Sequence, residues 1–218
     1  MNFEWSAFFD SIPNLLGGAR VTVMVALVSL PIGLLIGTIV GIILTYGHKS
    51  IRLIAQCYVG LIRGTPMIVQ IMFIFFAVPV LLGVRLSGLS AGILALVVNS
   101  SAYLAEIVRG GLLAVPKGLQ EAGLAMGLPM HRVISSIVGP VAFRRMLPAL
   151  GNQFIVGLKD TSLLIVIGVG ELTRTGQEIM TDNYRAVEVW FAVGLLYLVI
   201  ISVMTSVFKF IERAGRIS

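Results

Sequence analysis

The chain has 218 residues, of which 57% are hydrophobic and only 12% are charged. A soluble domain carries roughly twice that charged fraction, so the composition predicts an all-α protein embedded in a lipid bilayer. The net charge of +6 could indicate that the protein binds nucleic acid. In a membrane protein, however, the distribution of basic residues usually indicates which side of the membrane each loop faces. The single Cys57 excludes an internal disulfide framework and a cysteine zinc site, and His48 and His131 are too far apart in sequence to suggest a metal cluster.

The N-terminal region leads into the first predicted span. It contains Glu4 and Asp10 but no basic residue before Arg20. This is the opposite of a secretory signal, so we expect the region to remain in the mature protein. The uncharged stretch 21–47 is long enough to cross a bilayer with some tilt. Its glycines recur every fourth residue and predict a smooth face for close helix packing, within the same subunit in preference to a dimer seam: Gly33, Gly37 and Gly41.

Four further spans follow along the chain. The Arg63–Pro66 segment suits a break, with Thr65 as an N-cap and Pro66 in the first turn of a helix. The second span is therefore predicted from Pro66 to about Val84. The remaining spans are predicted at 89–107, at 146–170 with Lys159-Asp160 interrupting it, and at 189–208. Residues 1–218 are thus predicted to form one membrane domain, a bundle of about five transmembrane helices.

The distribution of charges predicts which side of the membrane each end faces. With the N-terminus outside, eleven basic residues fall inside, four fall outside and Lys159 lies within the membrane. The inside set is Lys49, Arg52, Arg63, Arg109, Lys117, Arg132, Arg144, Arg145, Lys209, Arg213 and Arg216; the outside set is Arg20, Arg85, Arg174 and Arg185. This excess follows the positive-inside rule, so we predict an outside N-terminus, a cytoplasmic C-terminus and no nucleic-acid partner.

The third span carries a polar stripe. Asn99, Tyr103 and Glu106 are spaced i, i+4 and i+7 and share one helix face, and Ser100 and Ser101 broaden it. Because lipid offers no hydrogen-bond partners, the stripe must face protein or water. Two interpretations stay open: a network that holds the helices together, and the wall of a translocation path.

The fourth hydrophobic region carries two ionisable residues at membrane depth. Lys159 and Asp160 are neighbours and cannot point the same way; Asp160 follows Gln153 by seven residues, and Thr161 and Ser162 extend the polar patch. A structural ion pair with another helix or a functional site would explain these charges. A zwitterionic solute would find complementary charge here, with Asp160 for an ammonium group or Lys159 for a carboxylate.

Motifs of enzyme chemistry are missing from the sequence. There is no His-Glu-x-x-His metal motif, no Gly-x-Ser-x-Gly elbow and no Gly-x-x-x-x-Gly-Lys phosphate loop. If the protein moves a solute uphill, another subunit must supply the energy.

The segment 117–140 is less apolar and is predicted to project into the cytoplasm. Residues 119–126 suit a helix that ends at Gly127, and Pro129 can begin a second short helix. The residues predicted at the tip of this projection are Leu128, Met130 and Val133, with Glu121 and Arg132 as its charges. Physical reasoning alone leaves a docking site for a partner protein and an interfacial connector equally open.

The spacing within this segment resembles the Glu-Ala-Ala loop of permease subunits in bacterial ATP-binding-cassette importers. That motif reads Glu-Ala-Ala, three residues, Gly, nine residues, Ile, one residue, Leu-Pro. The chain has Glu121-Ala122-Gly123, then Gly127, Ile137 and Pro140 at these positions. Gly123 replaces the second Ala and should loosen the first helix slightly, and Gly139 replaces the Leu.

Further segments resemble the polar-amino-acid branch of this family over nearly the whole chain. They are Arg63-Gly-Thr-Pro66, Asn99-Ser-Ser-Ala-Tyr-Leu-Ala-Glu106, Leu147-Pro-Ala-Leu-Gly-Asn-Gln153, Leu158-Lys-Asp-Thr-Ser-Leu163 and Glu171-Leu-Thr-Arg-Thr-Gly-Gln177. Members of this branch handle glutamine, glutamate, arginine, histidine, cystine and opines. The Phe3-Glu-Trp-Ser6 start and the Lys159-Asp-Thr-Ser162 segment are most similar to glutamine permeases.

The resemblance implies a multi-pass permease of the bacterial inner membrane that imports a polar amino acid by alternating access. Such importers pair two permease subunits, here a homodimer in preference to a heterodimer, with two cytoplasmic ATPase subunits. An extracytoplasmic binding protein delivers the amino acid. The chain itself would be no enzyme and would bind no cofactor, because ATP and magnesium belong to the partner ATPase.

The resemblance also implies roles for particular residues. Those expected to couple to the ATPase are Glu121, Ala122, Gly123, Gly127, Leu128, Met130 and Arg132. Those expected along the substrate path are Asn99, Ser100, Tyr103, Glu106, Lys159, Asp160, Thr161 and Ser162. A stand-alone secondary transporter or channel is the rival hypothesis, disfavoured by the lack of an inverted repeat, and a membrane scaffold without transport is a third. The sequence leaves the identity of the amino acid open.

Overall fold

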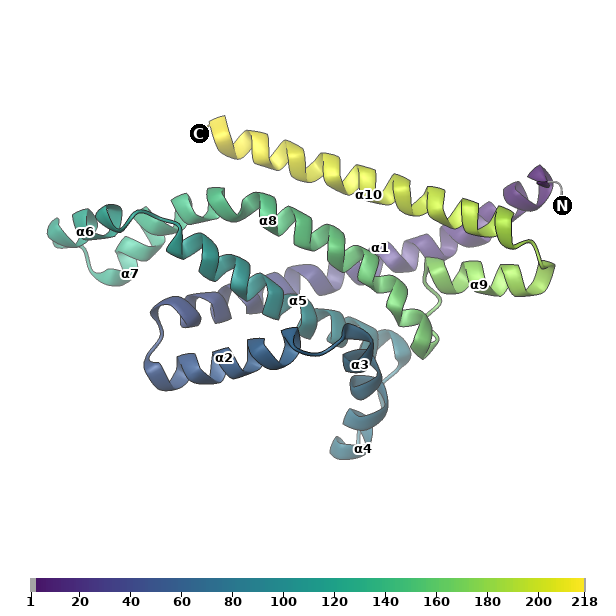
Figure 1. Ribbon diagram of the computed structural model, residues 1–218, viewed down its shortest axis with the longest axis horizontal. Helices are drawn as coiled ribbons and strands as arrows, with labels where there is room; N and C mark the ends of the chain where they lie inside the picture. The colour runs from purple at the N-terminus through teal and green to yellow at the C-terminus, as the bar shows by residue number, and fades with distance from the viewer. Residues whose placement is uncertain (1–2, 218) are drawn as a thin grey trace.

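The computed structural model describes residues 3–217, which form a bundle of helices without strands (Figure 1). Four helices are long and apolar enough to cross a membrane. A fifth crossing results if two consecutive bent helices, 49–63 and 67–82, count as one span. The prediction of an all-α bundle of about five spans is therefore confirmed.

The helical elements follow one another with short connections. In chain order they are α1 (Trp5–Tyr46), α2 (Lys49–Arg63), α3 (Met67–Met72), η1 (Phe73–Ala77), α4 (Val78–Leu82), α5 (Gly88–Leu113), α6 (Lys117–Ala125), α7 (Met130–Arg132), η2 (Val133–Val138), α8 (Gly139–Asp160), η3 (Thr161–Ile167), α9 (Leu172–Asn183) and α10 (Ala186–Ile217). Two of them, η1 and η2, are π-helical turns within longer helices, and η3 is a 3₁₀ turn that ends α8.

Helix α1 is much longer than the predicted first span. It begins at Trp5 instead of Val21 and ends at Tyr46, so its 42 residues extend over about 63 Å, twice the thickness of the hydrocarbon core. Its first turns pack against α9 and α10 in a core cluster of Phe8, Leu15, Ala19, Leu172, Val189, Ala192 and Val193. These tertiary contacts stabilise helix beyond the long apolar run that the sequence displays.

The glycine stripe of α1 packs against α5, the most buried of the spans. A β-carbon on Gly37 would lie 2.8 Å from the backbone oxygen of Ser101, and one on Gly41 would lie 2.7 Å from that of Ala105. Neither distance is possible for a larger residue without moving a helix. The prediction of close packing within the same subunit is confirmed.

Between α2 and α3 the chain turns by 104°. The predicted second span matches the helical stretch Met67–Leu82 closely, but Thr65 is not its N-cap. Pro66 holds that position, and the Thr65 hydroxyl instead donates to the carbonyl of Leu61 at 3.0 Å. The sequence analysis did not predict α2, whose buried residues recur every three or four positions and face α1 and α5: Ala55, Val59 and Ile62.

The later spans match their predictions with shifted ends. The predicted spans 89–107 and 189–208 are covered by the longer α5 and α10, while α8 and η3 together run from Gly139 to Ile167. The Lys159-Asp160 interruption corresponds to the change from α-helix to 3₁₀-helix at Thr161. The amphipathic α9 was not predicted, because its pattern is short and polar.

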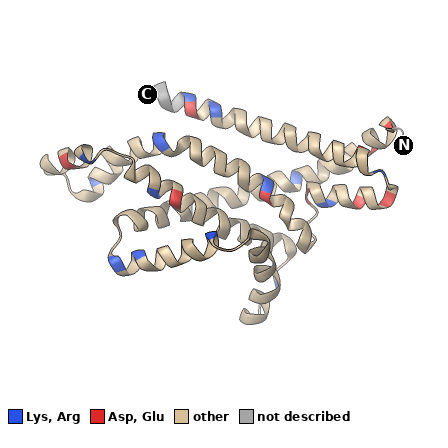
Figure 2. Cartoon of the chain, in the orientation of Figure 1, with Lys and Arg blue, Asp and Glu red and all other residues tan. Residues whose placement is uncertain are grey.

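The segments predicted to be cytoplasmic and those predicted to be outside lie at opposite ends of the molecule. The hairpin of α6 and α7 lies at the same end as the start of α2 and the C-terminus, whereas α9 and the N-terminus lie at the other (Figure 1). Basic residues concentrate toward the α6 end (Figure 2). The structure thus brings together the segments that the charge count assigned to one side, and the orientation in the membrane stays a prediction.

Candidate functional site

A polar cleft of about 500 Å³ opens between the α2–α3 turn, α5 and α8. Its lining residues are Arg63, Gly64, Thr65, Pro66, Met67, Asn99, Tyr103, Gln153, Val156 and Asp160. Three of the predicted path residues therefore share one space: Asn99 and Tyr103 from α5, and Asp160 from the end of α8. The sequence analysis placed Arg63 in the orientation count and at the Arg63–Pro66 break, but did not predict it along the substrate path.

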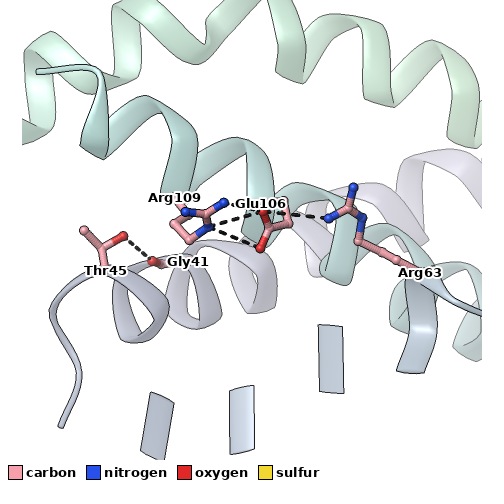
Figure 3. Close-up of polar contacts among 5 residues, drawn as sticks. All are labelled: Gly41, Thr45, Arg63, Glu106 and Arg109. Carbon is pink, nitrogen blue, oxygen red and sulfur yellow. Dashed lines mark hydrogen bonds and ion pairs between the residues drawn. The ribbon is translucent and has the colours of Figure 1, made fainter. Parts of the chain in front are cut away.

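Glu106 continues the polar face of α5 beyond the cleft and gathers two arginines (Figure 3). Its carboxylate lies 2.8 Å from the Arg109 guanidinium and 3.7 Å from that of Arg63. The Arg63 guanidinium also stands over the Tyr103 ring, 5.4 Å from its centroid, a favourable cation–π arrangement. These contacts hold Arg63 at the cleft, so Glu106 positions a lining residue and does not line the cleft itself.

Gln70, which the sequence analysis did not identify, connects the turn to α5. Its amide nitrogen donates to the carbonyls of Ile62 (2.7 Å) and Thr65 (3.0 Å), and its amide oxygen accepts from the Asn99 side chain at 3.0 Å. Because Gln70 is buried, these bonds satisfy polar groups that have no access to water. Asn99 thus joins α5 to α3, as the network interpretation predicts, and it also lines the cleft; its place on a translocation path stays a prediction.

On α8, Asp160 and Gln153 face the cleft together, as their seven-residue spacing predicts. Lys159 is exposed and is absent from the lining of the cleft, which confirms that the two neighbouring charges point in different directions. Among the described residues, no basic side chain forms an ion pair with Asp160. Its carboxylate therefore brings a negative charge to the wall of the cleft.

Besides Glu106, four predicted path residues lie outside the cleft lining. The Ser100 hydroxyl donates to the Leu96 carbonyl of its own helix at 2.6 Å, and its side chain packs where a β-carbon on Gly33 would stand. The Thr161 hydroxyl is buried and donates to the Leu158 carbonyl at 2.7 Å. Lys159 and Ser162 complete the set. For Ser100 and Thr161 the physical reason is plain, since a hydroxyl in an apolar helix bonds to its own backbone.

The α6–α7 hairpin forms the second candidate site. Helix α6 ends as predicted, with Gly127 in the left-handed region at φ +80° and its N–H donating to the Leu124 carbonyl at 2.9 Å. The second helix begins after Pro129 as predicted, but it is not short. It runs from Met130 through η2 into α8 without a break, because Gly139 keeps a right-handed helical backbone after the π-helical turn η2 and Pro140 falls in the first turn of α8.

The apolar tip of this hairpin differs from the prediction. Val133 is fully buried, and Leu128 packs against the same cluster of buried residues; Met130 is exposed as expected. The exposed apolar residues are instead Leu119 and Leu124 of α6 and its C-cap Met126, the last with 70% of its surface accessible. They adjoin the exposed Glu121 and Ala122.

Gly123 does more than loosen α6. A β-carbon there would lie 2.8 Å from Ile137 Cδ1 and 3.0 Å from Val133 Cγ2, so the glycine lets α6 pack directly onto η2. The hairpin is therefore a compact unit joined rigidly to α8.

The opposite end of the bundle has a buried acidic group, Glu171. Its carboxylate caps α9 by accepting the backbone N–H groups of Thr173 (2.9 Å) and Arg174 (2.7 Å), and it accepts the Tyr197 hydroxyl of α10 at 3.0 Å. Burial raises the pKa of the Glu171 carboxyl, although the hydrogen bonds oppose that shift. The sequence analysis named Glu171 only as part of a family-like segment; in the structure its carboxylate joins α9 to α10.

Comparison with known sequences identifies relatives over the whole chain. The profile of the family described as "Binding-protein-dependent transport system inner membrane component" matches residues 29–217. The glutamine transport system permease protein GlnP of Escherichia coli (strain K12) is 45% identical over 218 residues, which is 100% of both chains. The arginine transport system permease protein ArtQ of Bacillus subtilis (strain 168) is 33% identical over 98% of this chain and 97% of its own.

Solved structures share the fold. A chain from the crystal structure of an amino acid ABC transporter with histidines superposes with a TM-score of 0.90 at 32% identity, covering 98% of this chain and 100% of that one. A chain of the MetNI methionine ABC transporter in an inward-facing conformation gives a TM-score of 0.80 at 23% identity, over 94% and 97% of the two chains; it supports the fold alone.

Proposed function

The chain belongs to the family of binding-protein-dependent transport system inner membrane components, and from that premise we propose that it carries glutamine or a closely related polar amino acid into the cytoplasm by alternating access. It is a multi-pass permease subunit of an ATP-binding-cassette amino acid importer in the inner membrane. The observation that carries the proposal is the polar cleft, in which Arg63 and Asp160 line one space.

The cleft suits a zwitterionic amino acid. Its volume of about 500 Å³ is within the range of small-molecule sites. The Arg63 guanidinium would bind the α-carboxylate, since its planar fork matches that group, and the Asp160 carboxylate would bind the α-ammonium. The side-chain amides of Asn99 and Gln153 offer a donor and an acceptor each, which suits the amide of glutamine.

The α6–α7 hairpin is proposed to dock on the ATPase, a separate chain that binds ATP and magnesium and supplies the energy. The exposed Glu121 and the apolar Leu124 and Met126 would form the contact. The second arm of the hairpin is continuous with α8, so a displacement at Met130 moves the same helix that carries Asp160, about 45 Å away. One unbroken helix thus links the proposed docking site to the cleft.

The remaining parts of the assembly follow from the family. Two ATPases are proposed beneath two permease copies, identical in preference to different, and an amino-acid-binding protein would deliver substrate at the α9 end. This arrangement requires the N-terminus outside and the α6–α7 hairpin in the cytoplasm, as the basic residues predict.

The docking proposal is tested by co-purification. Glu121→Lys reverses a charge on the exposed face of α6 and should reduce recovery of the ATPase with the tagged permease at least about tenfold, because a like charge or an unpaired charge in an interface costs several kcal/mol. Asp182→Lys makes a similar change on exposed α9 and should leave recovery unchanged. Equal recovery for both variants would remove the hairpin from the interface.

The transport proposal is tested by uptake into vesicles. Glutamine uptake should require ATP and the binding protein, and unlabelled glutamine should compete better than other amino acids of a panel. Uptake by this chain alone without ATP would favour the rival hypothesis of a secondary transporter or channel.

A further inference from the structure

Two arginines share the carboxylate of Glu106 beside the polar cleft, one from its own helix and one from another (Figure 3). Arg109 follows Glu106 by three residues on α5, a spacing that places the two side chains together on one helix face. Its Nε donates to both carboxylate oxygens, at 3.3 and 3.2 Å, and its Nη2 donates to Oε2 at 2.8 Å. Arg63 at the end of α2 lies 3.7 Å from the same Oε2 atom. Glu106 is therefore bound tightly by Arg109 and loosely by Arg63.

The Arg63 guanidinium keeps its hydrogen-bond donors for other groups. A guanidinium carries several N–H donors in a planar fork. Within the part of the chain that the structure describes, that of Arg63 has only the long contact with Glu106 and the contact with the Tyr103 ring, and neither is a hydrogen bond. The Arg63 side chain is 44% accessible and lines the cleft, whereas Arg109 does not line it. Arg63 thus presents a positive charge and free donors to the cleft.

The charges around the cleft are balanced in number but are not all paired. Arg63 and Arg109 bring two positive charges and Glu106 brings one negative charge, so one positive charge remains on the α2 side of the cleft. Asp160 brings a negative charge to the cleft wall and, among the residues described, forms an ion pair with neither arginine. The cleft therefore holds one positive and one negative group apart, which is the charge pattern complementary to a zwitterion.

We propose that Arg109 is a positioning residue for solute binding: it holds the Glu106 carboxylate and so leaves the Arg63 guanidinium available to the carboxylate of a solute. Without Arg109, Glu106 has one cationic neighbour. The exposed Arg63 side chain then moves onto Glu106, because two parallel N–H···O bonds are stronger than one long contact. The cleft loses its positive group and retains Asp160. The identity of the ligand as a solute carboxylate rests on the proposed function; the competition of the two arginines for Glu106 does not.

Arginine-specific labelling tests this competition directly. The full chain is purified in detergent and treated with phenylglyoxal, and labelling of Arg63 is measured by mass spectrometry relative to the exposed Arg20. Arg63 should be labelled about fivefold more slowly in Arg109→Gln than in the unmodified chain, the upper range for a partly exposed ion pair. Glu106→Gln combined with Arg109→Gln should restore labelling, because the carboxylate that captures Arg63 is then removed.

The matched control is Arg174→Gln. Arg174 pairs with Glu178 at 2.7 Å and is 37% accessible, close to the 2.8 Å and 38% of Arg109, but it lies on α9 and does not line the cleft. This variant should leave the labelling of Arg63 unchanged. Equal labelling of Arg63 in Arg109→Gln and in the control would overturn the proposal, and so would a double variant that fails to restore labelling.

The conservative variant Arg109→Lys guards against an effect of misfolding. It keeps a positive charge beside Glu106, so labelling of Arg63 should stay within about twofold of that in the unmodified chain. Labelling as slow as in Arg109→Gln would contradict the proposal, because the charge of residue 109 would then not matter.

The ligand is tested separately. Glutamine should protect Arg63 of the unmodified chain from labelling. Glutaminol, which keeps the ammonium group and the side-chain amide but lacks the carboxylate, should protect it at least about tenfold less effectively, because the hydrogen bonds to a charged group are lost. The expected labelling without protection by glutamine would overturn the solute carboxylate as the ligand, and with it the proposed use of the cleft. Unchanged labelling in Arg109→Gln with normal uptake of glutamine would overturn the role of Arg109 alone.

Discussion

Helices α5 and α10 show how differently two spans of one protein are used. Helix α5 is the most buried span, although its sequence is the less apolar of the two, whereas α10 is the least buried and among the most apolar. The buried residues of α5 are mainly small or polar, such as Ala95, Ser101 and Asn99, while the exposed residues of α10 are large and apolar, such as Leu198 and Val203.

The difference in burial between α5 and α10 indicates which interactions drive helix packing in this bundle. Hydrocarbon is as apolar as leucine, so moving a large side chain between lipid and protein gains little, and close backbone approach and satisfied polar groups decide which helix is central. Helix α5 therefore carries the glycine contacts with α1 and lines the cleft, whereas α10 presents a largely exposed apolar surface. Replacements beside α5 should therefore disturb the protein more than replacements on the exposed face of α10.

Glycine replacement should show the largest contrast. Gly37→Leu places a side chain against the α5 backbone, 2.8 Å from Ser101 O at the β-carbon, and should lower the free energy of unfolding by about 3 kcal/mol. Gly194→Leu on α10 meets no atom within 4 Å and should be neutral. Thermal or detergent unfolding of the purified variants measures both, and equal destabilisation would refute the contrast.

Replacement of a cleft residue should have the second-largest effect, measured as a loss of transport. Asp160→Asn removes the proposed partner of the substrate ammonium and should lower uptake about thirtyfold, the equivalent of about 2 kcal/mol. Its control, Asn152→Ala, lies on an exposed position of the same helix outside the cleft and should retain uptake within about threefold. Normal uptake by Asp160→Asn would exclude this residue from the path.

Removal of buried hydrogen bonds should have a moderate effect. Gln70→Met leaves the Asn99 amide and the Ile62 carbonyl without their partner and should cost about 1–2 kcal/mol of unfolding free energy. Ser206→Ala on α10 removes a hydroxyl that donates to the Ser202 carbonyl of the same helix and should cost less than about 0.5 kcal/mol. The comparison fails if the two losses are the same.

The smallest effect concerns pH and the tie between α9 and α10. Because burial raises the pKa of Glu171, the folded protein binds this proton more tightly than the unfolded chain does. Its contribution to stability is therefore fully present below the ordinary glutamate pKa of about 4.3 and is lost as pH rises through the folded value. Unfolding followed from pH 4 to 8 should show this decline, and Glu171→Gln should flatten it.

The sequence determined the features that depend on composition and helix period. The span count, the glycine seam, the end of α6 at Gly127 and the shared face of Asn99 and Tyr103 were all predicted correctly. Each follows from a local rule. An apolar stretch of sufficient length predicts a membrane span, glycines at every fourth position predict a smooth helix face, and a glycine after a helical stretch predicts its end.

Only the tertiary structure decided what stands opposite each face. Helix period puts Ser100 next to Asn99 but does not say that Ser100 meets Gly33 while Asn99 meets Gln70. Likewise, the sequence shows that Gly123 has a low helix propensity, but it does not show that Gly123 packs against Ile137. The reason is physical: a periodic pattern specifies directions around one helix axis, whereas partners depend on how closely the other helices can approach, and that is settled by packing across the whole bundle.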